Sequence, residues 1–401
     1  MRIFESRIPF REFTPALVVV SNTLIWYTLT YMVFSNAINN LQAPANQTLV
    51  FFAVYYTGIA FSAILGSVAF PRARDTSLLL WMLTGVIMTT LLTTIVSNSM
   101  TINVLISLFL GVSIGIGLPS CLAYFADSTI TENRGTYGGI TWSIVGFGIL
   151  ILAFVINTLD LVLAFIVLAI WRAFGFVAFF FSQSRGKTPV RRTSDFRIIL
   201  GRRDVLLYFV PWIMFSLVNF AEAPMLQRLL GDFFILVVLI EFAISGFFAL
   251  VGGLLADLVG RKRVVITGFI MLGIEYAMLS LFSGMAVSWY LYAVFDGAAW
   301  GMFAAVFFMT LWGDLAEESV KEKYYVLGGL PYLLAGFLSV VIKPYVEMIE
   351  TVTAFSLASF FLFLAVLPLM YAPETLPEKR IREREVKKYI KKAEKTKEKY
   401  T

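Results

Sequence analysis

The sequence predicts an all-α membrane protein whose twelve spanning helices form two pseudo-symmetric six-helix bundles. Of its 401 residues, 59% are hydrophobic and only 14% are charged, whereas soluble domains are about a quarter charged. The apolar residues gather in runs long enough to cross a bilayer, which takes roughly 17 to 25 residues. One long basic loop separates six of these runs from the next six.

The composition excludes several kinds of chemistry. The chain has no histidine and a single cysteine, Cys121. Zinc sites, histidine-ligated haem, Ser-His-Asp or Cys-His catalysis and thiol pairs all need residues that are absent. The loops predicted outside the membrane are short and hold no acid-rich cluster. We therefore expect no enzyme, no metal and no cofactor, and any protons that the protein moves must be carried by carboxylates.

Each apolar run is predicted to be one spanning helix. The first run, 14–36, follows Arg2, Arg7 and Arg11 and is longer than the core of a cleavable signal peptide, which has about 7 to 15 residues. We expect it to stay as a spanning helix. The other predicted spans are 47–70, 76–97, 101–125, 135–157, 161–184, 205–229, 232–256, 262–284, 286–313, 323–347 and 351–371.

The basic residues predict the orientation. All 32 Lys and Arg residues except Arg172, Arg228 and Lys343 fall on one side of the predicted spans. Because positive loops are kept in the cytoplasm, we expect a multi-pass protein of the cell membrane with both termini cytoplasmic. The expected domains are an N-terminal bundle 1–184, a cytoplasmic linker 185–204, a C-terminal bundle 205–371 and a tail 372–401.

The tail is rich in Lys and Arg and poor in aromatic residues. A basic segment next to a membrane is expected to meet anionic lipid headgroups rather than nucleic acid. A tail that binds a protein partner is the alternative.

The two halves match at one offset, 187 residues. Because six helices and a cytoplasmic linker give both halves the same orientation, this predicts a parallel repeat, in which the substrate site lies near the membrane midplane between the halves. The matches pair Gly66, Ala69 and Arg74 with Gly253, Ala256 and Arg261, and Asp127, Arg134 and Tyr137 with Asp314, Lys321 and Tyr324.

The segment 253–264, GLLADLVGRKRV, resembles the signature loop between helices 8 and 9 of the major facilitator superfamily, with Gly253, Asp257, Gly260, Arg261 and Lys262 at the matching positions. Physically, Gly253 permits a close helix approach and Gly260 a tight turn, and Asp257 can pair with Arg261 across that turn. The resemblance implies the fold of that family, and a latch in which this pair and neighbouring helix 11 hold one conformer of the transport cycle.

The first-half copy of this loop, GSVAFPRARD, departs from the pattern. Phe70 stands where the acid is expected and Ala73 where the second glycine is expected, although Arg74 remains. This half of the predicted latch therefore lacks its acid.

Two further acids close predicted spans. Asp127 and Asp314 stand at the C-terminal ends of their helices, where an acid is unfavourable for the helix dipole. Both also match helix-end acids of the resembled family, and both are expected to have basic partners. Arg134 is the candidate partner of Asp127, with Arg74 or Arg261 nearby, and Lys321 takes the place of Arg134 in the second half.

A third resemblance concerns the start of the tail, where Pro373, Glu374 and Thr375 resemble the PET motif of sugar porters and related organic ion transporters. The companion motif expected after helix 6 is not visible in SQSRGKTPVRRT. This motif favours a sugar or an organic ion as the substrate.

Charges inside the spans are candidates for the working site, because a charge at the bilayer centre costs about 2.5 to 3.5 kcal/mol. In the resembled fold, helices 7, 8 and 10 line the cavity, which makes Glu222, Glu241 and Asp296 the cavity candidates. The charged residues within predicted spans are Glu222, Glu241, Glu275, Asp296, Arg172 and Lys343.

Asp296 and Glu222 are the first candidates for a substrate or proton-coupling carboxylate. Trp300 follows Asp296 by four residues and shares its helix face, which suits a cation. A carboxylate withdrawn from water can bind and release a proton during a transport cycle. The alternative is an acid hydrogen-bonded to a neighbouring helix. Further candidates on similar faces or at a similar depth are Asn219, Asn36 and Asn39.

These features together predict a secondary active transporter, a monomer that moves a small organic solute by alternating access with a proton or another coupling ion. One alternative is a multidrug-type exporter of amphipathic cations, favoured by the surplus of acids and the many Phe residues. Outside transport, the alternative is a membrane receptor or scaffold.

Overall fold

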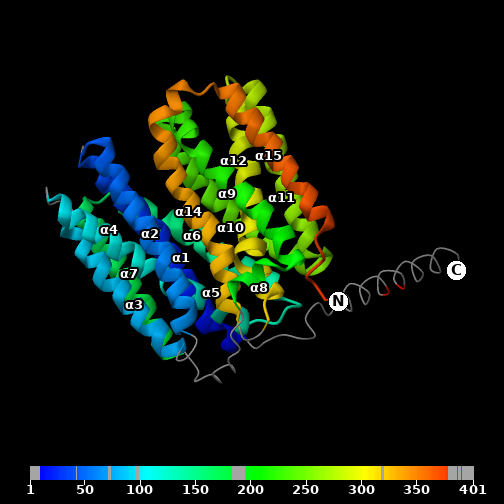
Figure 1. Cartoon of the computed structure of the whole chain (residues 1–401), viewed down its shortest axis with the longest axis horizontal. Helices are drawn as coiled ribbons and strands as arrows, with labels where there is room; N and C mark the ends of the chain where they lie inside the picture. Colours follow the sequence, from blue (N-terminus) through cyan, green and yellow to red (C-terminus); the bar gives the residue numbers. More distant parts are fainter. Residues whose placement is uncertain are drawn as a thin grey trace.

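The computed structural model describes residues 10–41, 43–70, 74–94, 99–182, 195–317, 320–377, 386 and 390. Within these ranges all regular structure is helical, as Figure 1 shows. Residues 185–194 of the predicted linker and most of the predicted basic tail lie outside the described residues, as does Ala73.

The first six predicted spans are helical. The fourth consists of two helices, α4 and α5, which join near Gly117, and Pro119 stands in the first turn of α5, where a missing N–H costs little. The helices of this half are α1 Phe10–Asn40, α2 Ala45–Ala69, α3 Arg74–Leu91, α4 Met100–Gly115, α5 Leu118–Asp127, α6 Arg134–Ile156 and α7 Leu161–Ser182.

The second half begins after a short helix in the predicted linker, α8 Phe196–Leu200. Its tenth span changes from α-helix to π-helix at Ala304 and ends in a last α-helical turn. The helices of this half are α9 Arg203–Leu230, α10 Phe234–Val259, α11 Arg261–Phe282, α12 Ala286–Phe303 with the π-helix Ala304–Leu311, α13 Trp312–Leu315, α14 Lys321–Ile342 and α15 Thr351–Tyr371.

Eleven segments of the described residues are long and apolar enough to cross a membrane. One of them, Arg203–Val259, is 57 residues long and contains both α9 and α10, which are joined by the turn Gly231–Phe233. All twelve predicted spans are therefore present as helices, and the chain is a multi-pass membrane protein.

The most extensive contacts between helices of the two halves are those of α6 with α10 and of α2 with α14, and α5 also meets α14 while α6 meets the π-helix. In Figure 1, α2, α3 and α4 lie on one side and α9, α11, α12 and α15 on the other, with α6, α10 and α14 between them. The α6–α10 pair packs tightly: an ideal Cβ on Gly253 would lie 2.2 Å from the carbonyl oxygen of Gly135. The close approach predicted for Gly253 is confirmed.

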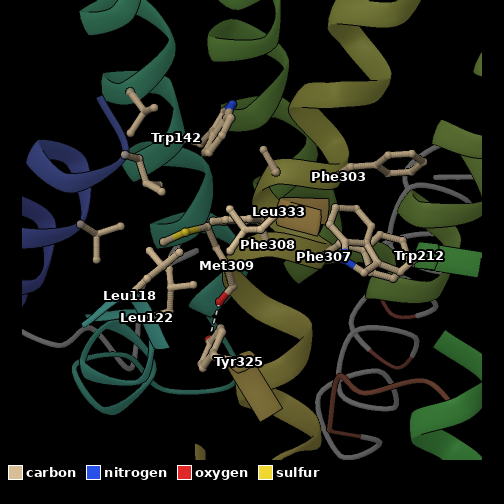
Figure 2. Close-up of a cluster of buried hydrophobic side chains, with 14 of the residues drawn as sticks. Leu118, Leu122, Trp142, Trp212, Phe303, Phe307, Phe308, Met309, Tyr325 and Leu333 are labelled. Carbon is tan, nitrogen blue, oxygen red and sulfur yellow. Dashed lines mark hydrogen bonds between the residues drawn. The ribbon is translucent and has the colours of Figure 1, made fainter. Parts of the chain in front are cut away.

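A cluster of large buried side chains fills the region where α5, α6, α9, α14 and the π-helix meet (Figure 2). The ring of Trp142 lies 5.9 Å from that of Phe308, and Trp212 stacks on Phe307 at 4.8 Å between centroids. The Tyr325 hydroxyl donates a hydrogen bond of 2.7 Å to a carbonyl oxygen of the π-helix, that of Met309. This packing joins side chains of both halves.

Candidate functional site

Charged side chains from both halves meet where several helices begin or end. We call this place the basic end, because α3, α6, α11 and α14 each start there with a basic residue. Two acids, Asp127 at the end of α5 and Asp314 in α13, lie among them. Each of these helix-end acids has basic partners, as predicted.

The signature loop has the predicted local geometry. Gly260 takes a φ of 109°, a conformation that favours glycine, so the chain can turn from α10 into α11 without a spacer. The Arg261 guanidinium is completely buried and lies 2.9 Å from the Asp257 carboxylate. The predicted pairing of these two residues across the turn is confirmed.

Asp257 also reaches across to the other half. Its carboxylate accepts hydrogen bonds from the main-chain N–H groups of Gly135 at 3.1 Å and Thr136 at 2.6 Å, and from the Thr136 hydroxyl at 2.6 Å. Asn133, at the N-cap position of α6, makes no side-chain capping bond. Asp257 therefore caps α6, where its negative charge is also favoured by the helix dipole.

The expected contact of this loop with helix 11 is wrong. Helix 11 is α14, whereas Asp257 caps α6, the fifth span. The reason is packing, because α10 lies against α6, and α14 lies against α2.

Asp314 joins the two halves. One carboxylate oxygen pairs with Arg134 of α6, and the other accepts a hydrogen bond of 3.1 Å from Nε of Arg261. The side chains of Asp314 and Arg261 are 0% exposed and that of Arg134 is 4% exposed. The predicted pair of Arg134 with Asp127 is therefore wrong, because Arg134 crosses to the acid of the other half. We call Asp257, Arg261, Asp314 and Arg134 the second-half latch.

The corresponding residues of the first half make a similar set. Asp127 pairs with Arg74 of its own half and with Lys321 of the other half. Arg74 also pairs with Glu322, in the first turn of α14. We call Arg74, Asp127, Lys321 and Glu322 the first-half latch.

Sequence reasoning missed two acids at this end. The comparison of the two halves did not point to Glu322, because the residue at the matching position of the first half is Gly135. Glu374 belongs to the PET segment and caps α11, accepting hydrogen bonds from the N–H groups of Arg261 at 2.8 Å and Lys262 at 3.2 Å. The Nζ of Lys262 donates to the carbonyl oxygen of Met370 at 2.6 Å.

The predicted cavity acids lie in the second half, away from these latches. Glu222, Glu241 and Asp296 come from α9, α10 and α12, and Glu275 joins them from α11. Glu222, Glu275 and Asp296 are 5%, 0% and 3% exposed, while Glu241 is half-buried. Asp296 is the eleventh residue of α12, which is about 15 Å from the helix start at 1.5 Å per residue.

These four acids influence one another electrostatically, and Asp296 is the neighbour shared by Glu222, Glu241 and Glu275. We call the four residues the carboxylate cluster. Tyr276 neighbours Glu222, and Tyr292 neighbours Glu241. In the described part of the chain, none of the four forms an ion pair, and both carboxylate oxygens of Glu222 and of Glu275 lack hydrogen-bond partners.

The other predicted site residues are more scattered. The half-buried Trp300 packs against Phe215 and Tyr332, with centroid distances of 4.9 and 5.4 Å. Asn219 is half-buried on α9. Asn36 and Asn39 are exposed near the end of α1.

Tyrosines and phenylalanines line the second contact between halves. The hydroxyl of Tyr56 on α2 donates a hydrogen bond of 2.8 Å to that of Tyr31 on α1. The ring of Tyr56 also lies 5.9 Å from that of Phe337 on α14. Aromatic faces and hydroxyl groups therefore lie together where α2 meets α14.

A charged side chain is also buried within a spanning helix of the first half. Arg172 of α7 is 0% exposed, and its guanidinium carbon lies 4.4 Å from the ring centroid of Trp26 and 4.6 Å from that of Trp81. Its Nη1 donates to Asn22 at 3.0 Å and to Thr23 at 2.8 Å. Cation–π contacts and neutral acceptors hold this charge, rather than a carboxylate.

A pocket of about 470 Å³ lies between α9 and α14, among apolar side chains such as Ile213, Leu217 and Leu334. None of the carboxylate cluster lines it. Within the described ranges, no group of three or more Cys, Asp or Glu residues could hold a metal ion.

Comparison with known proteins identifies the architecture. The chain is similar to the structure of the MFS (major facilitator superfamily) proton:xylose symporter XylE bound to 6-bromo-6-deoxy-D-glucose, with 14% identity, a TM-score of 0.72 and coverage of 91% of this chain and 97% of that chain. It is also similar to the MFS transporter FucP in the outward conformation, with 11% identity, a TM-score of 0.68 and coverage of 90% and 99%. Neither a family model nor a curated protein sequence matches the chain.

Proposed function

We propose that this chain, which has the fold of the major facilitator superfamily, is a secondary active transporter that moves a small organic solute by alternating access. The observation that carries the proposal is the pair of latches at the basic end. Each latch joins a helix start of one half to charged side chains of the other. Such contacts can hold the halves together at one end and be released when one bundle rocks on the other.

The conformation described is the one in which the basic end is closed. The positive-inside rule places this end in the cytoplasm, together with both termini, in the cell membrane. The alternating-access cycle then exposes the substrate site to the outside in this state. The FucP structure that the chain resembles is also in an outward conformation.

Proton coupling is assigned to the carboxylate cluster. Asp296 is buried in the middle of a span, and neither it nor its acidic neighbours form an ion pair among the described residues. An isolated charge is costly in such a place, and a bound proton removes that cost. Glu241, which is half-buried, is the member through which protons enter the cluster, and Glu222 and Asp296 hold them.

The substrate is a sugar or an organic ion, taken up as a single molecule between the halves. Aromatic faces beside hydroxyl groups, as at Tyr31 and Tyr56, suit the apolar faces and hydroxyl groups of a sugar. The symporter that the chain resembles carries xylose with protons. The protein acts as a monomer without enzymatic activity, and its basic tail meets anionic lipid headgroups.

A second candidate is export of amphipathic cations. The observation that favours it is the cluster of four acids with Trp300 four residues after Asp296. A carboxylate beside an aromatic face attracts a cation. In this case the carboxylate cluster binds the cation and protons in turn, and the protein exchanges one for the other across the membrane.

The test uses the full chain in proteoliposomes that contain a pH-sensitive dye. A screen of sugars, organic acids and cationic drugs for ligands that raise the melting temperature supplies the substrate. Addition of that substrate should change the internal pH, and the Asp296→Asn variant should bind it but lose the pH change. Glu347→Gln, which alters an exposed acid, is the matched control. Full proton coupling in the Asp296→Asn variant would contradict the assignment of this residue, and absence of flux with every solute would favour a receptor or scaffold.

A further inference from the structure

The two latches have the same plan except for one acid. Arg74 and Asp127 repeat the contact of Arg261 and Asp314, and Lys321 with Asp127 repeats Arg134 with Asp314. The exception is the acid of the signature loop. Its first-half counterpart is Phe70, which ends α2 and packs against the apolar core.

The missing acid has a substitute on the opposite side of the same contact. Asp257 reaches from the α10–α11 turn to Gly135 in the first turn of α6. In the first half, Glu322 takes the position that corresponds to Gly135, and its carboxylate reaches back from the first turn of α14 to Arg74. The negative charge has moved from the loop to the helix start that the loop acid would have capped.

We propose that Glu322 is the gating acid of the first-half latch, so that a cross-half ion pair replaces the cross-half helix cap that closes the second half. This inference rests on the proposed alternating-access function. It goes beyond that function by assigning a gating role to a residue at which the sequence repeat fails.

The geometry supports a strong contact. The side chains of Glu322 and Arg74 are 3% and 9% exposed, so water competes little for either charge. Among the described residues, Nε of Arg74 has no hydrogen-bond partner, and the other two guanidinium nitrogens donate to Asp127 and Glu322. Glu322 is also placed where the dipole of α14 favours a negative charge.

An ordinary intrahelical role does not account for Glu322. The residue four positions later is Val326, and Glu322 makes its ion pair with a residue of the other half, 248 positions away. A surface pair would be screened by water and contribute little, but this pair is buried. Its loss leaves Arg74 with one carboxylate instead of two.

The experiment measures how often the basic end opens, without any substrate. Leu122 is 2% exposed and lies in the cluster between the halves, so a cysteine there reacts with a bulky maleimide only when that region opens. The sole native cysteine is removed in a Cys121→Ala background that carries Leu122→Cys, as full-length protein in detergent. Glu322→Gln should raise the alkylation rate by about tenfold or more, because a buried ion pair that loses one partner is strongly destabilised.

The decisive variant moves the acid from position 322 back to position 70 in the loop. Phe70→Asp combined with Glu322→Gln restores the arrangement of the second half, and the alkylation rate should return to within about threefold of the background, because an acid at position 70 can cap α14. The matched control is Glu317→Gln, an exposed acid at the same end, which should leave the rate unchanged. A rate for Glu322→Gln equal to that of this control, or no recovery in the combined variant, would overturn the proposal.

This readout is independent of transport. If the unmodified chain moves no solute but the alkylation rates follow the expected order, the proposed transport function fails and the gating role of Glu322 stands. If the unmodified chain transports a solute but the alkylation rates do not respond, the transport function stands and the gating role of Glu322 fails.

Discussion

Asp257 of α10 and Thr136 of α6 form a helix cap between the two halves of the protein. The carboxylate accepts both the main-chain N–H and the hydroxyl of Thr136, each at 2.6 Å. An acid of a loop thereby completes a helix that is more than a hundred residues away in the sequence. The strength of this cap and of the ion pairs beside it determines how firmly the basic end is closed.

Loss of the Asp257 cap should open the basic end. Asp257→Ala removes the acceptor for two N–H groups and leaves Arg261 with one carboxylate fewer. Loss of a cap costs about 1 to 2 kcal/mol, so alkylation of a cysteine at position 122 should rise about 5- to 30-fold. Asp160→Ala removes an exposed acid that bonds the N–H of Leu163 in α7, and this control should leave the alkylation rate unchanged.

The two helix-end acids provide an internal comparison of burial. Asp314 has a side chain that is 0% exposed and pairs with two arginines, whereas Asp127, its repeat partner, is 28% exposed. Asp314→Asn should lower the free energy of unfolding by about 3 to 5 kcal/mol, and Asp127→Asn by about 1 kcal/mol. Unfolding in mixed micelles, followed by tryptophan fluorescence, measures both. Equal losses would show that burial does not set the strength of these contacts.

Replacement of Arg172 by lysine should destabilise the folded protein. Its guanidinium lies between Trp26 and Trp81 and donates to Asn22 and Thr23. A lysine keeps the charge but lacks the planar group that stacks on both rings, so Arg172→Lys should lower the free energy of unfolding by about 2 to 4 kcal/mol.

The comparison for this position is Arg172→Met, which removes the charge and keeps much of the volume. Because an uncompensated buried charge is costlier than an apolar side chain of similar size, this variant should melt at a higher temperature than Arg172→Lys. The opposite order would mean that the charge itself, rather than the stacking geometry, stabilises the bundle.

Much of the fold follows from the sequence because the rules involved are local. A run such as 135–157 is long and apolar enough to span a bilayer, and α6 occupies Arg134–Ile156. The signature loop is also local: Asp257 and Arg261 are four residues apart, and their predicted contact forms. The predicted fold is confirmed by its likeness to solved transporters of the superfamily.

The partners across the halves did not follow from the sequence. Arg134 was matched with Asp127 because the two are near in the chain, but Arg134 pairs with Asp314. Glu322 carried no motif, and its repeat partner is a glycine. The acids of the carboxylate cluster were recognised one by one as charges within apolar runs, but their proximity depends on how four separate helices are rotated about their axes.

The sequence by itself determined the spanning helices, the repeat at an offset of 187 residues and the turn at Gly260, because hydrophobic length and local backbone preference depend only on neighbouring residues. The tertiary structure alone decided that α6 packs against α10 and α2 against α14. That packing places Asp257 on the start of α6 and Glu322 beside Arg74. Charge pairing depends on distance in space, and the contacts that close the basic end join residues more than a hundred positions apart in the chain.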